Sequence, residues 1–197
     1  MKKTFLSALT AVALGTPKVI RARTRDVAFT YRMGAGFAGD INRTHPFDCV
    51  AERQDVSDPI TLYGNGCLMN TVNGTVRAVI AADQSDSVAI SLYGVLVRPY
   101  PTQQANTTQG LGNTAPPIAP AILDILTEGF IMVKVNGTPT KRGPVFIWTS
   151  ASAGAHVVGG FESAADAGDT VRVLNAYFNG PPDANGVVEM RVWNQGI

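Results

Sequence analysis

After residue 46 the chain alternates between short apolar runs and clusters of glycine, proline and asparagine. Residues 67–83 hold two such runs around Asn73-Gly74, a dipeptide that tolerates the positive φ angles of a hairpin turn. Residues 186–193 alternate between apolar and polar positions, as a strand with one buried face does. Further apolar runs occupy residues 88–97, 129–135, 144–148, 156–161 and 170–178. About nine strands at this spacing predict a small barrel or sandwich.

Helical patterns are confined to short segments. Residues 5–13 place four apolar side chains on one helical face, and Pro17 ends that pattern. The segment also imitates a secretory signal, but polar residues interrupt its apolar run. It is too short to span a membrane, which takes about 20 apolar residues. We therefore expect one short N-terminal helix that docks on the body or on a neighbouring subunit, and two more short helices at 119–127 and 162–167.

These elements predict a mainly β protein with two parts. Residues 47–197 form a β-rich domain, expected to be a small β-barrel or a β-tulip-like sandwich. Residues 1–46 comprise the N-terminal helix, an extended basic arm and a glycine-rich loop. Residues 99–120 are rich in proline, glycine, glutamine, asparagine and threonine, which predicts a long excursion loop. Loops of this length in a compact domain usually carry function or lie against a partner.

The charge is distributed unevenly along the chain, although only 16% of its residues are charged and the net charge is +1. Residues 1–32 carry seven basic side chains and one acidic one, whereas the remainder carries nine basic and fourteen acidic side chains. A basic arm on a mildly acidic body indicates a partner with an acidic surface. Direct contact with nucleic acid is disfavoured, because the basic residues are not interleaved with aromatic ones and no nucleic-acid-binding motif is present.

The glycine-rich stretch Gly34-Ala-Gly36-Phe-Ala-Gly39 matches the dinucleotide-binding spelling G-x-G-x-x-G. That site requires a helix that opens at the last glycine, so that its N-terminus faces the pyrophosphate. Pro46 arrives within two turns, and the chain lacks the alternation of strands and helices on which that fold depends. We therefore interpret the stretch as a loop that adopts positive φ angles or passes close to another chain.

The sequence indicates no catalytic, metal or cofactor chemistry. It contains neither the G-x-S-x-G nor the P-loop motif, and His45 and Cys49 lack a third group that would make them a catalytic set. Acidic pairs at 83/86 and 166/169 lie among small residues and read as turns. Two cysteines and two histidines without close grouping do not make a zinc site. Whether Cys49 and Cys67 form a disulfide is open at this point.

Four stretches of the chain resemble the structural cement, or capsid decoration, proteins of tailed bacteriophages. The resemblance spans most of the chain from residue 26 onward. Its first two stretches are the most specific, because they are long and unusual in composition. The stretches are YRMGAGFAGDINRTHP (31–46), YGVLVRPYPTQQ (93–104), GFIMVKV (129–135) and NAYFNGPPDANGVVEMRVW (175–193).

This resemblance implies a β-rich virion structural protein without enzymatic activity. Made in the host cytoplasm, it would bind the outside of the phage head and stabilise contacts between major capsid protein subunits. Its expected partners are the major capsid protein and other copies of itself, as a dimer or trimer. No small-molecule substrate, cofactor, metal or membrane is expected. The contact residues that we predict are Arg21, Arg23, Arg25, Arg32, Gly34, Gly36, Gly39, Arg43, Arg98 and Tyr100.

A β-rich virion adhesin or receptor-binding module is the alternative interpretation. It would recognise sugars or another host surface, and it predicts an exposed aromatic cluster of Tyr100, Trp148 and Trp193 near one pole of the domain.

Overall fold

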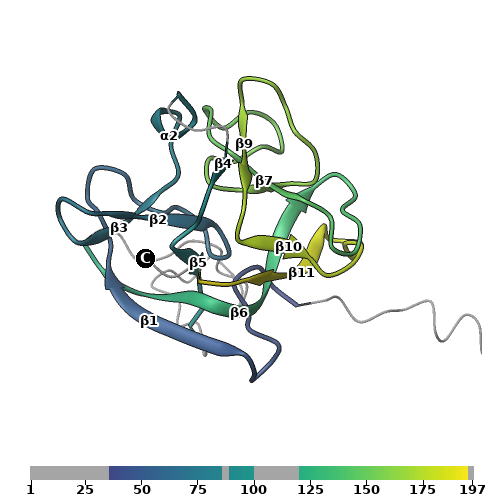
Figure 1. Ribbon diagram of the computed structural model, residues 1–197, viewed down its shortest axis with the longest axis horizontal. Coiled ribbons are helices and arrows are strands. Elements are labelled where there is room, and N and C mark those ends of the chain that lie inside the picture. The colour runs from purple at the N-terminus through teal and green to yellow at the C-terminus, as the bar shows by residue number, and fades with distance from the viewer. Residues whose placement is uncertain (1–35, 86–88, 100–119, 195–197) are drawn as a thin grey trace, which may run out of the picture. The chain divides into compact units, whose positions relative to one another are not determined.

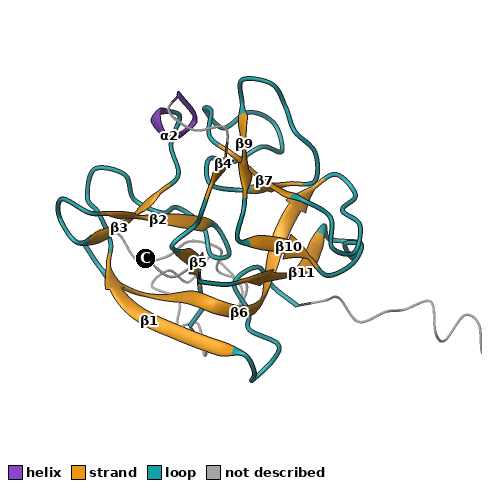
Figure 2. Ribbon diagram, viewed as in Figure 1, coloured by secondary structure: helices purple, strands orange, loops and turns teal. Residues whose placement is uncertain are grey.

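The computed structural model describes residues 36–85, 89–99 and 120–194, which form a mainly β body (Figure 1). The predicted N-terminal helix, the basic arm and most of the predicted 99–120 loop lie outside the described residues. The one described helix is α2 (Ala82–Ser85). The strands are β1 (Phe47–Arg53), β2 (Gly66–Asn70), β3 (Thr75–Ala78), β4 (Ala89–Ile90), β5 (Gly94–Leu96), β6 (Ile122–Asn136), β7 (Val145–Trp148), β8 (Phe161–Glu162), β9 (Thr170–Val173), β10 (Ala176–Phe178) and β11 (Val187–Val192) (Figure 2).

The strands form a single mixed sheet in the order β3-β2-β5-β6-β8-β7-β9-β4, and β1 and β11 also pair with β6. The prediction of a mainly β fold is confirmed, but the sheet is open rather than a closed barrel. The segment that follows β1 lies beside β3, the first strand in this order. There Gln54 forms a bridge with Val76, and the backbone N–H of Asp55 donates to the Val76 carbonyl at 2.8 Å. The sheet is therefore curved but does not close into a barrel.

The 15-residue strand β6 is the centre of this sheet. Its first half pairs with β1 and β5, and its second half pairs with β11 and β8. Both faces are buried over most of residues 125–133: Ile125 belongs to one apolar cluster, and Leu126 belongs to another. The expected helix at 119–127 is therefore wrong. A strand that is buried on both faces reads as a nearly continuous apolar run, which periodicity cannot separate from a buried helix.

Two apolar clusters fill the interior. The smaller one lies among β2, β3, β5 and the start of β6 and contains Ile60, Leu96 and Ile125. The larger one extends over β4 to β11 and contains Phe161 and Phe178. Each such side chain contributes about 1.5–3 kcal/mol when it is fully buried, so burial in the two clusters is the main favourable term in folding.

The two cysteines belong to different clusters and are free. Cys67 is fully buried in the smaller cluster, where its Sγ donates to the Gly94 carbonyl at 3.3 Å. Cys49 packs against the larger cluster. Burial raises the pKa of Cys49 to about 11 and that of Cys67 to about 12. Both thiols are therefore protonated at neutral pH, which fits packing rather than nucleophilic chemistry.

Two runs that the sequence predicts as single strands are each divided in two. The 88–97 run forms β4 and β5, and the 170–178 run forms β9 and β10. The buried amide of Asn175 joins the two breaks: its Oδ1 accepts from Leu92 N at 2.8 Å, and its Nδ2 donates to Leu92 O at 2.8 Å. The same Nδ2 donates to the Trp193 carbonyl at 2.8 Å. The Asn175 side chain thus supplies the hydrogen bonds that backbone pairing would otherwise supply at these two breaks.

Substituting Gly94 by alanine is expected to destabilise the protein, because β5 passes very close to β6. A Cβ at Gly94 would lie 2.5 Å from Ile125 Cγ2 and 2.6 Å from the Leu126 carbonyl oxygen. Forcing an atom into such a packed site costs about 1–3 kcal/mol. The free energy of unfolding, measured by chemical denaturation, should fall by that amount for Gly94→Ala. Gly180→Ala is the control, because its Cβ would meet nothing within 4 Å. Equal midpoints for both variants would contradict this packing.

Candidate protein-contact surface

The glycine-rich segment, residues 36–43, lies against β6. Gly39 N donates to the Met132 carbonyl at 2.7 Å, and Met132 N donates to the Asp40 carbonyl at 2.8 Å. Ile41 continues this antiparallel pairing through a bridge with Ile131. The segment is therefore attached to the β body through the same central strand as β1, β5, β8 and β11.

The positive φ angles that the sequence predicts for this segment are present, at 125° for Gly36 and 91° for Gly39. A Cβ at Gly39 would lie 3.0 Å from both the Cβ and the backbone N of Arg98. A Cβ at Gly64 would lie 2.8 Å from Gly39 N. Glycine is needed here because segments of the same chain come close together. Contact of this loop with another protein remains a prediction.

Arg98 joins the glycine-rich segment to the end of β5. Its backbone N donates to the Gly39 carbonyl at 2.9 Å, and its guanidinium lies 4.5 Å from the centre of the Phe37 ring. One guanidinium nitrogen lies 3.5 Å from Asp40 Oδ1. Only 9% of the Arg98 side chain is exposed, whereas Phe37 is 56% exposed. We refer to residues 36–40 and 98–99 together as the Gly39–Arg98 corner.

Arg43 forms a bidentate ion pair with Glu189 of β11. Its Nε and Nη2 lie 2.7 and 2.6 Å from the two carboxylate oxygens. Asn42 and Asn179 donate to the same carboxylate. Partial burial by itself would raise the pKa of Glu189, but the hydrogen bonds from Arg43, Asn179 and Asn42 outweigh it and lower the pKa. Arg43, which the sequence predicts as a capsid contact, thus has a carboxylate partner within the chain itself.

The predicted contact residues therefore fall into three groups. Gly36, Gly39 and Arg98 meet at the Gly39–Arg98 corner, and Arg43 lies farther along the same segment. The others lie outside the described residues: Arg21, Arg23, Arg25, Arg32, Gly34 and Tyr100. Sequence reasoning did not identify Glu189, because a pairing across 146 positions leaves no local signal.

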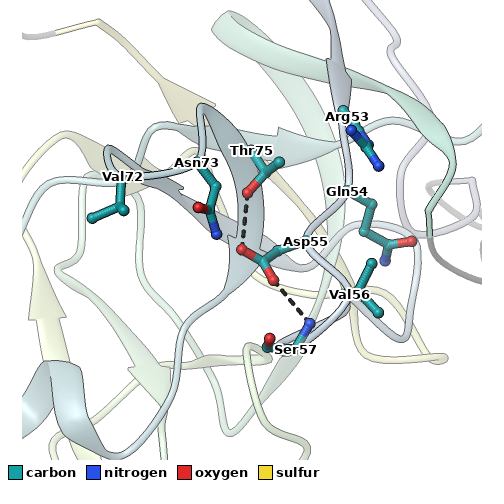
Figure 3. Close-up of a pocket in the computed structure, with 8 residues that line it drawn as sticks. All are labelled: Arg53, Gln54, Asp55, Val56, Ser57, Val72, Asn73 and Thr75. Carbon is teal, nitrogen blue, oxygen red and sulfur yellow. Dashed lines mark hydrogen bonds between the residues drawn. The ribbon is translucent and has the colours of Figure 1, made fainter.

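A hollow of about 520 Å³ lies between the end of β1 and the β2–β3 hairpin (Figure 3). Its buried carboxylate, Asp55, accepts hydrogen bonds from Ser57 N, Thr75 Oγ1 and Asn70 Nδ2, each at 2.8 Å. These bonds, led by that from Ser57, lower the pKa of Asp55 to about 2. These hydrogen bonds hold the turn after β1 against the β2–β3 hairpin. The Asp55 carboxylate is therefore not available as a free acid or base in this hollow. Its lining residues are Arg53, Gln54, Asp55, Val56, Ser57, Val72, Asn73 and Thr75.

A polar cluster at the start of β8 positions His156. Its Nδ1 lies 2.9 Å from Glu162 Oε1, and its ring stacks on Trp148 with centroids 4.2 Å apart. Trp148 is only 6% exposed. The adhesin interpretation predicts that Trp148 is exposed, and this prediction is wrong. Tyr100, another member of the predicted aromatic cluster, lies outside the described residues.

Among the described residues, no three metal-ligating side chains gather into a site, and no helix is long and apolar enough to cross a membrane.

Comparison with known proteins identifies the family. Residues 27–192 match the family model of the XM1 gp53 minor capsid protein. The chain belongs to this family. It is thus a structural protein of the bacteriophage virion, located in the capsid, and the predicted phage capsid family is confirmed.

A solved structure shares the fold. The match is to a chain in a structure titled "The capsid of Myoviridae Phage XM1", with a TM-score of 0.59 and 20% sequence identity. The similarity covers 85% of this chain and 95% of that chain. No curated protein matches the sequence.

Replacing Asp55 by asparagine should weaken the fold at neutral pH and much less in acid. The folded-state pKa of about 2 lies below the value of roughly 3.9 for an unfolded aspartate. The ionised group therefore stabilises the fold above about pH 4, and this contribution disappears as the pH falls through 2. Urea denaturation at pH 6 and near pH 2 should show the difference between parent and Asp55→Asn shrinking in acid. The exposed Asp124→Asn is the control, and a pH-independent difference would contradict the assignment.

Proposed function

We propose that the protein is a cement, or decoration, protein that binds the outside of the phage head and stabilises contacts between major capsid protein subunits. Membership of a minor capsid protein family supports this role. The proposal includes self-association as a dimer or trimer and assigns the protein no catalytic step. Each of its contacts can be modest, because many copies act together on one head.

The observation that carries the proposal is the composition of the Gly39–Arg98 corner. It brings together three of the predicted contact residues, Gly36, Gly39 and Arg98. The backbone N of Arg98 donates to the Gly39 carbonyl at 2.9 Å and holds the two segments of the corner together. Contacts that these three residues make with one partner can therefore act together.

Exposed apolar surface occurs at the corner and at the start of β1. Phe37 is 56% exposed at the corner, and Phe47 at the start of β1 is 49% exposed. Exposed aromatic rings next to arginine are enriched at protein interfaces. The guanidinium of Arg98 below the Phe37 ring holds that ring in place, so the ring loses little side-chain entropy when a partner covers it.

Deleting residues 1–32 should weaken or abolish binding to purified empty heads while leaving a folded body. Residues 1–32 carry seven basic side chains and one acidic one, and this excess of positive charge would meet an acidic coat surface. Binding is measured by cosedimentation at fixed stoichiometry together with the thermal resistance of the heads. Circular dichroism and the unfolding midpoint of the deleted variant report whether the body is intact.

A matched pair of double variants separates the role of the arm from general electrostatics. Arg23→Gln with Arg25→Gln removes two charges from the arm, and Arg53→Gln with Arg172→Gln removes two exposed charges from the body. Only the first pair should reduce head binding. Undiminished binding by the deletion variant would refute the role of the arm, and failure of the unaltered chain to bind heads would refute the proposed function.

A further inference from the structure

A row of arginine and aromatic side chains crosses the outer face of β6, β11 and β10. Phe130 is opposite Arg191 in the β6–β11 pairing, and Arg191 is opposite Tyr177 in the β10–β11 pairing. Side chains directly opposite each other in neighbouring strands lie on the same face of the sheet. The other face of β11 is buried, because Val188, Met190 and Val192 pack in the larger cluster. The row therefore lies on the side of these strands that faces away from the larger cluster.

Two further arginines extend this row at its ends. Arg43 lies 4.2 Å from the centre of the Phe130 ring, and Arg142 lies 5.3 Å from the centre of the Tyr177 ring. The Trp193 ring is 5.9 Å from that of Tyr177. We call these six residues the arginine–aromatic strip: Arg43, Phe130, Arg191, Tyr177, Arg142 and Trp193.

The positive charge of the strip is only partly neutralised. Glu189 pairs with Arg43. Within residues 36–85, 89–99 and 120–194, neither Arg142 nor Arg191 forms an ion pair with a carboxylate. The buried Nε of Arg191 also has no hydrogen-bond acceptor, which is a cost to the fold. Arg142 and Arg191 are therefore placed over aromatic rings without a carboxylate partner in the described part of the chain.

Arg142 occupies its position at the expense of backbone strain. Its φ of 61° is the one positive value among the described non-glycine residues, and its N–H donates to the Phe178 carbonyl at 2.7 Å. The left-handed conformation is unfavourable for a residue with a Cβ atom, whereas glycine would adopt it freely. Such strain is found where a side chain is needed for function.

We propose that the arginine–aromatic strip is a docking surface for a carboxylate-rich face of a capsid subunit. Arginine, tyrosine and tryptophan are the residues that dominate interface hot spots, and guanidinium groups bind carboxylates in a bidentate manner. We choose a capsid subunit as the partner because the chain belongs to a minor capsid protein family. This inference rests on the proposed function and assigns it a second contact region besides the arm and the Gly39–Arg98 corner.

The test uses the full chain and purified empty heads. Arg142→Glu should weaken cosedimentation with heads by about tenfold or more, as reversal of a hot-spot charge does. Arg142→Gly should also weaken binding, yet it should preserve or raise the unfolding midpoint, because glycine relieves the strained φ. If Arg142 had only a structural role, weaker binding would be accompanied by a lower unfolding midpoint. Arg172→Glu, which reverses an exposed charge on β9, is the matched control and should bind as the parent does.

The outcomes distinguish this inference from the function on which it rests. If both Arg142 variants bind heads as tightly as the parent, the strip is not the docking surface, although the cement role stands. If the parent itself does not bind heads, both proposals fall. A changed oligomeric mass of Arg142→Glu with unchanged head binding would make the strip a contact between copies. Loss of duplex DNA binding without loss of head binding would make it a nucleic-acid surface, and both of these results overturn the inference.

Discussion

The structure depends on the burial of strand β6 on both faces and on its pairing along both edges. Its first half is shared by β1 and β5, and its second half by β11 and β8. Residues 39–41 add a further pairing at Ile131 and Met132. Every backbone group that a strand buries must find a partner, so the neighbours of β6 are obligatory rather than optional. The two apolar clusters are separate because β6 and its neighbours divide them.

The sequence predicts the elements that have one buried face better than those that have two. The alternation in residues 186–193 gives β11 and its buried Val188, Met190 and Val192 correctly. The N-terminal half of β6 was taken for a helix, since Leu123 and Leu126 face opposite clusters and destroy the alternation. Interruptions such as those between β4 and β5 could not be foreseen, because the side chain that closes them, Asn175, lies 83 positions from Leu92.

The candidate surface shows the same division between local and long-range information. Positive φ angles at Gly36 and Gly39 follow from local composition, because glycine is the residue that adopts them freely. What those glycines approach is set by Arg98 and Gly64, which the sequence gives no reason to place there. Charge partners are equally non-local. The sequence identified Arg43 as a candidate contact residue. Only the structure shows that Glu189 neutralises it, while Arg142 and Arg191 have no such carboxylate among the described residues.

The antiparallel attachment of residues 39–41 also determines how the protein responds to force. A pull on Gly36 directed along β6 stretches the bonds from Gly39 N and to Asp40 O together, so that both must break at once. A pull perpendicular to the strand opens the same bonds one after another, which takes a much smaller force. The attachment is therefore mechanically anisotropic: it resists sliding and yields to peeling. On a shell under outward pressure, the orientation of β6 relative to the surface would set how much tension one copy can carry.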